Sequence, residues 1–275
     1  MSIIKVMVNG LPGDMSANVA RHILKDERFH LVPFSLTGPE IEENSVEIDS
    51  VNIDLLKPQD RDNEIKSIKD LEQDFISVDY THPTAVNLNA KFYCKNNLPF
   101  VMGTTGGKRK ELEKEVLKSS IPAIIAPNMG KQIVGFQAMM EYAANTFPDL
   151  FKDFSLTILE SHQSTKADTS GTARAMVSNF NKMGVAFTED EINMERNPEL
   201  QKSLGIPEEY LKGHAWHTYS LTSSDDTVHF RFVHNINGRD IYSRGTLDAV
   251  VYLFKKINEG QKSVVYSMID VLKNK

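Results

Sequence analysis

The residue types best suited to chemistry gather in one stretch of the chain, from Glu160 to Thr172. His162 carries a side chain that changes charge near neutral pH, so it could move protons. Lys166 could hold an anion or donate a proton. The run Ser170-Gly171-Thr172 precedes a helix-like segment, and backbone N–H groups at a helix N-terminus form an anion site. The stretch therefore suits a small carboxylate substrate that must be protonated.

A purely structural role for the same stretch is the alternative. A loop with one histidine and one lysine is common, and a serine before a helix is an ordinary N-cap. An apolar, strand-like run, Phe154–Leu159, leads into the stretch, and a helix-like run, Ala173–Phe180, leads out of it. These flanking elements are compatible with both interpretations, so the spacing alone does not decide between them.

Composition narrows the class of protein. The chain has 275 residues, is 40% hydrophobic and 25% charged, and carries a formal net charge of −6. This balance argues against broad nucleic-acid binding. Cys94 is the only cysteine, which fits a reducing compartment. No apolar run approaches the roughly 20 residues that span a bilayer, and the first apolar run is too short for a signal peptide. We expect a cytoplasmic enzyme that is not associated with a membrane.

The N-terminus has the layout of a dinucleotide phosphate site. An apolar strand, Ile3–Val8, is followed by a glycine turn and a helix over Ala17–Leu24. Glycines let the backbone approach a pyrophosphate, and the helix N-terminus faces its charge. The pattern here is Gly10-x-x-Gly13-x-x-Ser16, which lacks the third glycine of the usual motif. A strand–helix turn with two glycines is also common without any nucleotide.

The second predicted strand, Leu31–Leu36, leaves the choice between NADPH and NADH open. An acidic residue near the end of this strand usually binds the ribose hydroxyls of NAD. Here no carboxylate follows until Glu40, which removes one obstacle to a 2′-phosphate. No Arg or Lys follows directly, however, and Asp14 in the first loop would repel a phosphate if it lay nearby.

Three later strands end in loops that are polar or rich in glycine. In an open α/β sheet, ligands bind beyond the carboxyl ends of the strands. Such loops are also ordinary in α/β proteins without a ligand, but their convergence favours a cofactor site. The predicted strands are Phe75–Tyr80, Pro99–Met102 and Ile121–Ala126, and their loops are Thr81-His82-Pro83, Gly103 to Gly107 and Pro127 to Gly130.

The pattern changes after about residue 130. An amphipathic helix, Lys131–Asn145, precedes an alternating strand, and a helix over Thr172–Met183 follows. Two alternating runs joined by Ser223 to Asp226 indicate a β-hairpin. Such a sheet often packs against a second copy of the chain. The remaining assignments are an irregular segment Asn193–Gly213, hairpin strands Ala215–Leu221 and Thr227–Asn235, a strand Asp240–Thr246, and helices Leu247–Asn258 and Ser263–Leu272.

Taken together, the motifs resemble the 4-hydroxy-tetrahydrodipicolinate (dihydrodipicolinate) reductases, in their plant-type branch. The resemblance covers nearly the whole chain, and the last motif is the most specific. The motifs are Val8-Asn9-Gly10 through Met15, Asp79-Tyr80-Thr81-x-Pro83, Gly103-Thr104-Thr105-Gly106, Ala126-Pro127-Asn128-Met129-Gly130-Lys131-Gln132, and Glu160-x-His162-x-x-x-Lys166-x-Asp168-x-Ser170-Gly171-Thr172-Ala173. Because no transit peptide is visible, the resemblance implies a plant-like bacterial member.

The resemblance implies an α/β fold with two domains. An N-terminal Rossmann-like, doubly wound parallel sheet would comprise residues 1–127 and 246–275. An inserted α+β domain with a mixed or antiparallel sheet, residues 128–245, would bind substrate and form a homo-oligomer, a dimer or a tetramer. The implied reaction is NAD(P)H-dependent reduction of a cyclic dicarboxylate to tetrahydrodipicolinate in lysine and diaminopimelate biosynthesis.

The resemblance also implies roles for individual residues. His162 would be the acid/base residue and Lys166 the proton donor to the ring after hydride arrives. No metal is expected. The implied substrate contacts are Gln163, Ser170, Gly171 and Thr172. The implied contacts to NADPH or NADH are Asn9, Gly10, Leu11, Pro12, Gly13, Asp14, Met15, Ser35, Thr81, Gly103, Thr104, Thr105, Ala126, Pro127, Asn128 and Met129.

This sequence departs from the common family pattern in four places. Gln163 stands where the usual motif has a second histidine; it can donate a hydrogen bond but cannot titrate. Ser16 replaces a glycine, and Asp14 replaces a basic or polar residue, which leaves the cofactor preference open. His82 occupies a variable position beside the nicotinamide-side loop, and we interpret it as a bystander.

Two other functions are considered beside the reductase. One is another NAD(P)-dependent dehydrogenase of amino-acid metabolism, such as one acting on a semialdehyde. Those that pass through a thioester need a cysteine nucleophile, and Cys94 in a predicted helix is badly placed for that. The other is a non-catalytic nicotinamide-binding regulator. The presence of both His162 and Lys166 argues against it.

Overall fold

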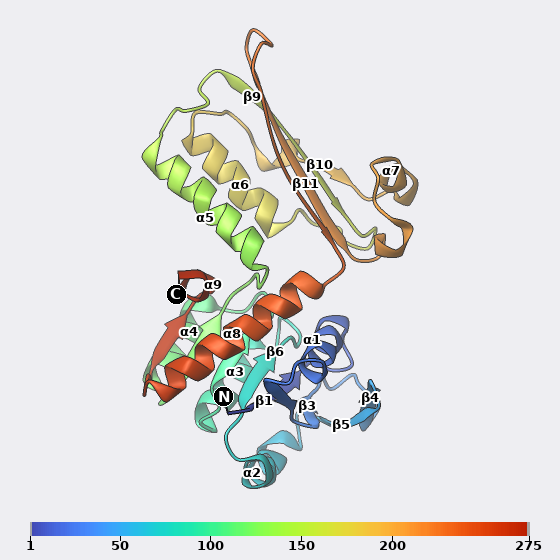
Figure 1. Cartoon of the computed structure of the whole chain (residues 1–275), viewed down its shortest axis with the longest axis vertical. Helices are drawn as coiled ribbons and strands as arrows, with labels where there is room; N and C mark the ends of the chain where they lie inside the picture. Colours follow the sequence, from blue (N-terminus) through green and yellow to red (C-terminus); the bar gives the residue numbers. More distant parts are fainter. Residues whose placement is uncertain (1, 274–275) are drawn as a thin grey trace. The chain divides into compact units, whose positions relative to one another are not determined.

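The computed structural model describes residues 2–273, which form two compact units (Figure 1). The first unit contains the chain up to Lys131 and from Asp240 onward. The second unit is the continuous segment Gln132–Arg239. The chain therefore leaves the first unit once and returns to it once.

The first unit is built on a six-stranded sheet with the order β13-β8-β7-β6-β1-β2. All of its strand pairings are parallel. The central strands are buried on both faces and are made of short apolar runs, as expected for a doubly wound sheet. The strands are β1 (Ile4–Asn9), β2 (Phe29–Leu31), β6 (Ile76–Asp79), β7 (Phe100–Met102), β8 (Pro122–Ile125) and β13 (Val264–Tyr266).

Helices of the first unit supply the apolar faces that cover this sheet. Residues of α2, α3 and α4 share one core with Phe100, Met102 and Ala123 of the strands. Helices α1 and α8 contact each other, and α8 also contacts β6, β7 and β8. This arrangement confirms the predicted α/β class. The helices are α1 (Asp14–Leu24), α2 (Arg61–Glu72), α3 (Val86–Lys95), α4 (Arg109–Lys118), α8 (Asp240–Asn258) and α9 (Met268–Lys273).

The prediction of one second strand over Leu31–Leu36 is wrong. The segment divides at Pro33 into β2, which pairs with β1, and β3 (Phe34–Leu36), which pairs with β5 (Val51–Leu56). Proline has no N–H for a central sheet ladder, so the chain turns there. A small three-stranded sheet, β3-β5-β4, results, with β4 at Ser45–Ile48.

The second unit carries a four-stranded sheet with the order β10-β9-β11-β12. The sheet is mixed, because β10 runs parallel to β9 and the other pairs are antiparallel. Helices α5 (Lys131–Thr146) and α6 (Gly171–Lys182) share a core with one face of this sheet (Figure 1). The strands are β9 (Phe154–His162), β10 (Asn193–Glu195), β11 (His214–Ser223) and β12 (His229–Asn237).

The segment Asn193–Gly213 is more regular than predicted. It contains β10 and the short helix α7 (Pro198–Ser203). Asn197 caps α7 through its side-chain oxygen, and Pro198 occupies the first helical position. The polar composition of the segment obscured both elements, since β10 is only three residues long and α7 six.

Two predictions near the C-terminus are also wrong. Asp240–Thr246, predicted as a strand, forms the first turns of α8, whose buried residues Ser243, Thr246 and Val250 follow helical spacing. Ser263–Leu272, predicted as one helix, holds β13 and then α9. The β-branched and aromatic residues of β13 extend the sheet beside β8.

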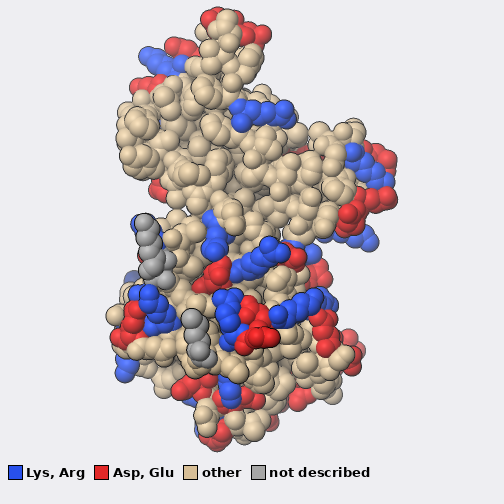
Figure 2. Space-filling model, in the orientation of Figure 1, with Lys and Arg blue, Asp and Glu red and all other residues tan. Residues whose placement is uncertain are grey.

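The charged side chains form no broad basic stripe on the face shown in Figure 2. On the face shown in Figure 2, Lys and Arg side chains are interspersed with Asp and Glu. Among the described residues, no helix is both long and apolar enough to cross a membrane.

Candidate active site

The first unit contains a cleft of about 990 Å³ at the carboxyl ends of β1, β3 and β6. The loop after β1 passes close to the end of β6, and glycine makes this possible. Gly10 has a φ of 106°, and a Cβ there would lie 2.3 Å from the backbone oxygen of Tyr80. The cleft is lined by Gly10–Asp14, Leu36–Ile41, Pro58, Arg61, Tyr80–His82, Thr84, Ala85, Leu88 and Asn89.

Helix α1 begins at Asp14, three residues earlier than predicted, with Gly13 as its N-cap. Its first turn therefore follows the glycine loop directly, and the loop and the helix N-terminus border the same cleft. Exposed backbone N–H groups at such a helix end are suited to a pyrophosphate. The local geometry thus fits the dinucleotide that the sequence predicts.

Two predicted cofactor residues use their side chains inside the protein. Asn9 is fully buried; its Oδ1 accepts from the Leu36 N–H at 2.9 Å, and its Nδ2 donates to the Tyr93 hydroxyl at 3.1 Å. The Ser35 Oγ accepts from the Leu11 N–H at 3.2 Å. Asn9 and Ser35 therefore fix the loops around the cleft.

A buried carboxylate that the sequence analysis gave no role holds two further loops. Asp79, at the end of β6, accepts from the Thr81 hydroxyl at 2.8 Å and from the Thr104 hydroxyl at 2.6 Å. The Tyr93 hydroxyl and the Asn89 amide donate to its other oxygen at 2.7 and 3.0 Å. The hydroxyl of Thr104 is thereby occupied within the protein.

The predicted cofactor residues are not all brought to this cleft. Gly10 to Asp14 and Thr81 line it. Met129 and Ala126 are buried, and the Asn128 Oδ1 accepts from the Gly130 N–H at 2.8 Å. The predicted residues outside the lining are Asn9, Met15, Ser35, Gly103, Thr104, Thr105, Ala126, Pro127, Asn128 and Met129.

Two charged side chains that were not predicted as contacts also line the cleft. The carboxylate of Glu40 folds back over Gly38, where a Cβ would lie 2.2 Å from its Oε1. The Arg61 guanidinium lies 4.9 Å from the Phe92 ring centroid and donates to Asn89 at 2.9 Å. The Glu40 carboxylate and the Arg61 guanidinium therefore both lie at the part of the cleft beyond the end of β3.

In the second unit, the predicted loop from Glu160 begins later than expected. Strand β9 continues through His162, so Glu160 and His162 belong to the strand and share one of its faces. The neighbouring strand β11 places His217 directly opposite Glu160. All three side chains are buried. The strand, rather than the loop, thus fixes the histidine.

Glu160 and Arg196 form the central contact of this region. The Arg196 Nη2 donates to the Glu160 Oε1 at 2.6 Å, and the Ser170 N–H donates to Oε2 at 3.1 Å. Burial raises the pKa of Glu160, but the nearby His217 imidazole and the hydrogen bonds from Arg196 and Ser170 outweigh it and hold the pKa well below its usual range. Glu160 is therefore an ionised carboxylate in the interior.

The same arginine holds the loop that carries Lys166. The Arg196 Nε donates to the Lys166 carbonyl at 2.8 Å. The Lys166 Nζ donates to the Asp168 carboxylate at 2.7 Å, and this bond keeps the pKa of Asp168 below its usual range. The Lys166 side chain is 22% exposed, so part of it is open to solvent.

His162 differs from the expectation of a group that titrates near neutral pH. Burial and the nearby His217 lower its pKa to about 4, so the imidazole is uncharged near neutrality. Its Nε2 is buried without a hydrogen-bond partner among the described residues. His217 also stacks on His234, with ring centroids 4.6 Å apart. The site therefore packs the imidazole rings of His162, His217 and His234 against one another.

The Ser170-Gly171-Thr172 run begins α6, as predicted. Ser170 is the N-cap; its Oγ accepts from the Ala173 N–H at 3.1 Å and lies 2.9 Å from the His217 Nε2. The first turn of α6 presents the backbone N–H groups of Gly171 and Thr172. Gln163 directly follows β9, and its carbonyl accepts from the Lys166 N–H at 3.0 Å.

Sequence reasoning missed Arg196, His217 and His234. Arg196 lies in the segment that was assigned as irregular. His217 occupies an inward position of β11, on the same face as Tyr219 and Leu221. The available signal for His217 was a polar residue at a position of the strand where the alternating pattern calls for an apolar one.

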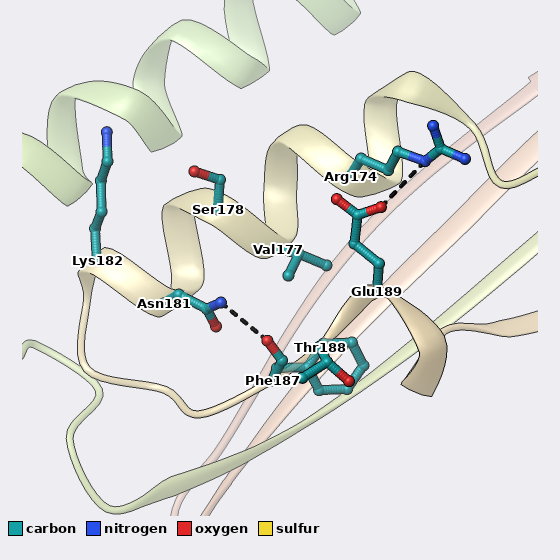
Figure 3. A pocket seen from close by; sticks show the side chains of 8 residues that line it. All are labelled: Arg174, Val177, Ser178, Asn181, Lys182, Phe187, Thr188 and Glu189. Carbon is teal, nitrogen blue, oxygen red and sulfur yellow. Dashed lines mark hydrogen bonds and ion pairs between the residues drawn. The ribbon is translucent and has the colours of Figure 1, made fainter.

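A depression in the second unit, of about 630 Å³, lies on α6 (Figure 3). Figure 3 shows Arg174, Ser178 and Lys182 along the helix. Arg174 is paired with Glu189 at 3.3 Å. None of the predicted site residues lines this depression.

Cys94, in helix α3 of the first unit, is unsuited to nucleophilic chemistry, since burial raises the pKa of its thiol.

Comparison with known proteins identifies the family. The family model of the dihydrodipicolinate reductase N-terminus matches residues 4–129, and that of the C-terminus matches residues 133–272. The chain belongs to the dihydrodipicolinate reductase family. The reductases of this family use NAD(P)H and act in lysine biosynthesis, so the predicted family, reaction and cofactor class are confirmed.

The similar reductases include plant proteins. A probable 4-hydroxy-tetrahydrodipicolinate reductase 1, chloroplastic, of Oryza sativa is 47% identical over 269 residues, covering 98% of this chain and 78% of the relative. The chloroplastic reductase 2 of Arabidopsis thaliana is 45% identical over 271 residues, with 98% and 77% coverage. A dipicolinate-bound dihydrodipicolinate reductase from Paenisporosarcina sp. TG-14 has the same fold, with a TM-score of 0.65, 18% identity, and 96% and 97% coverage.

Removing Arg196 is expected to destabilise the second unit of this reductase strongly. In Arg196→Met, the buried Glu160 carboxylate loses its cation, which typically costs about 3–5 kcal/mol. Chemical denaturation followed by circular dichroism measures the loss. The control is Arg174→Met, which breaks a half-exposed pair with Glu189 and should cost little. Equal effects of the two substitutions would contradict the central role of the Glu160–Arg196 pair.

Proposed function

We propose that the second unit binds the cyclic dicarboxylate and completes its reduction. Bound NAD(P)H supplies a hydride to the conjugated C=C–C=N system. A proton must then reach the ring, and the ammonium of Lys166 donates it. The observation that carries this proposal is the Glu160–Arg196 pair, because its contacts hold both the Lys166 loop and the Ser170 cap.

The α6 N-terminus supplies the carboxylate subsite in this proposal. Gly171 and Thr172 offer backbone N–H groups at the positive end of a helix. Ser170, whose hydroxyl already caps the helix, fixes the direction of these groups. Gln163 adjoins the same loop and donates a hydrogen bond to the substrate. The ammonium of Lys166 pairs with the substrate in place of Asp168.

His162 acts as a neutral imidazole in this site. With its pKa lowered to about 4, it accepts or relays a proton near neutral pH and adds no second cation. Its unpartnered Nε2 is the atom available for this task. Lys166 thus supplies the positive charge, and His162 accepts a proton from the ring or from an ordered water, or relays one to it.

The cofactor occupies the cleft of the first unit. Gly10 to Met15 hold the pyrophosphate, and a carboxylate and a guanidinium lie beyond β3. Glu40 accepts from the ribose hydroxyls of NADH, whereas Arg61 attracts a 2′-phosphate. We infer that both cofactors are used, and that Glu40 and Arg61 set their ratio.

We also propose the domain roles, the assembly and the compartment. Residues 1–127 with 246–275 bind the cofactor, and residues 128–245 bind substrate and form a dimer or tetramer. The sheet face opposite α5 and α6 supports this assembly: Val233 on it is 50% exposed, and Thr218 of β11 is its direct neighbour. The single cysteine supports a reducing, cytoplasmic setting, which fractionation of the producing cells tests.

Lys166→Ala is expected to lower kcat by about 10²–10⁴-fold, because removal of a general acid has this typical cost. The KM for the cofactor should change little. A coupled assay measures both: a separate synthase condenses pyruvate with aspartate semialdehyde, and absorbance of the reduced nicotinamide is followed. Lys182→Ala, at the other end of α6, is the matched control. Unchanged turnover in Lys166→Ala would reject the proton-donor role.

Glu40→Gln is expected to shift the preference toward NADPH. Loss of a charge-assisted hydrogen bond to the ribose should raise the KM for NADH by about tenfold or more, and the KM for NADPH should fall. Initial rates with each cofactor give the ratio. Glu42→Gln, which alters an exposed residue outside the cleft lining, serves as the control. An unchanged NADPH-to-NADH ratio in Glu40→Gln would show that this carboxylate does not select the cofactor.

Val233→Arg is expected to dissociate the assembly, because a charge would be placed in an apolar contact between copies. Sedimentation velocity should show a dimer or tetramer for the unaltered chain and a smaller species for the variant. Leu71→Arg makes the same change at an exposed leucine of the first unit and should leave the mass unchanged. A monomeric unaltered chain would refute the proposed assembly.

A further inference from the structure

Three side chains with metal-ligand chemistry converge in the second unit. Glu160 and His162 project from one face of β9, and His217 projects from β11 at the position directly opposite Glu160. The ligand atoms of the three residues lie within 4.8 Å of one another, and all three residues are buried. The pairing of two strands therefore creates a donor set that the spacing along the sequence does not reveal.

The distances between these atoms leave room for an ion. The Glu160 Oε2 lies 3.6 Å from the His217 Nε2 and 3.9 Å from the His162 Nε2. Both separations exceed a hydrogen bond. A tetrahedral Zn²⁺, with bonds of about 2.0–2.2 Å, holds its ligand atoms roughly 3.4 Å apart. Modest side-chain rotations of the two imidazoles would close the difference.

One nitrogen atom of this cluster has no hydrogen-bond partner among the described residues. The Nε2 of His162 is buried without a hydrogen-bond partner in the described part of the chain, and the residue is 8% exposed. Buried polar atoms normally have partners, so such an atom calls for an explanation. The His217 Nε2 is hydrogen-bonded to the Ser170 Oγ at 2.9 Å, so an ion that binds this nitrogen replaces that contact.

The surrounding charges favour a particular class of metal. Arg196 engages Oε1 of Glu160, whereas Oε2 accepts from the Ser170 N–H and also faces the imidazoles of His162 and His217. Within this cluster, the charges of Glu160 and Asp168 are balanced by Arg196 and Lys166. The cluster therefore has no excess negative charge that would attract cations of every kind. Binding depends on coordination by imidazole, which favours Zn²⁺ over Mg²⁺ or Ca²⁺.

We propose that Glu160, His162 and His217 form an inhibitory site for a divalent transition metal of the Zn²⁺ class. The ion takes the lone pairs of both imidazoles and one carboxylate oxygen, and three protein ligands leave a position for water. The inhibition rests on the proposed function, because metallation of His162 removes its acid/base capacity. Metal binding itself does not depend on that function.

Calorimetry of the full-length, chelator-treated chain with Zn²⁺ tests the site. One equivalent per chain should bind to the unaltered protein, and Mg²⁺ should not bind. In His217→Gln, which keeps a donor toward Ser170, zinc affinity should fall by about 10²-fold or more, since even indirect changes around metal sites cost 10–100-fold. His229→Gln, which removes an exposed histidine at the far end of the hairpin, should bind as the unaltered chain does.

A spectroscopic readout identifies the ligands. Co²⁺ in place of zinc should give visible d–d absorption bands that depend on His162 and His217, and Zn²⁺ should abolish them. If His217→Gln does not fold, His162→Gln replaces it, and the zinc-dependent rise in Tm of each chain is compared. Absence of stoichiometric zinc binding, or equal affinity in the ligand variant, would overturn the proposal.

The kinetic arm separates this proposal from the reductase mechanism. In the coupled assay with excess synthase, zinc should inhibit cofactor oxidation in proportion to site occupancy, and a chelator should restore it. An active reductase that binds no zinc would overturn only the metal site. A chain that binds zinc through these residues but does not reduce the substrate would overturn only the proposed function. Zinc binding without inhibition would refute the inhibitory role.

Discussion

The pair between the buried Glu160 and the partly buried Arg196 is the contact on which the rest of the second unit's site depends. Removing two charges from water is costly, and the cost is met only when the geometry is good and the remaining polar atoms are bonded. Both conditions hold here: Glu160 accepts from the Ser170 N–H, and Arg196 also donates to the Lys166 carbonyl. One ion pair thus fixes a helix cap and the loop that carries Lys166. A lysine ammonium can then be exposed to substrate while its backbone is held.

In the first unit, the carboxylate of Asp79 holds loops in place through neutral hydrogen-bond donors rather than through a cation. Asp79 collects hydroxyl and amide donors from Thr81, Thr104, Tyr93 and Asn89, and this network joins the loops after β6 and β7. In both units a buried acid on a strand holds loops through hydrogen bonds. Asn9, Ser35 and Thr104, which were predicted as cofactor contacts, also form hydrogen bonds that hold these loops.

The sequence was most informative where one physical signal dominated. Short, continuous apolar runs predicted the parallel strands of the first unit, and the motif from Glu160 to Ala173 predicted the chemistry and the family. Errors arose where a local signal competed with tertiary pairing. Pro33 divided a predicted strand, and the stretch from Asp240 joined a helix because its core contacts follow helical spacing. Arg196 was missed since only strand pairing brings it to Glu160, 36 residues away along the chain.

The position of β13 has a consequence for the order in which the molecule is completed during synthesis. This strand closes the edge of the first sheet beside β8, although Val264 and Pro122 are far apart in the sequence. Helix α8, which contacts β6, β7 and β8, also begins only at Asp240. The second unit is one continuous segment that ends at Arg239. A ribosome therefore releases the complete inserted unit first, while the sheet that precedes it in the sequence still waits for its last strand and covering helix.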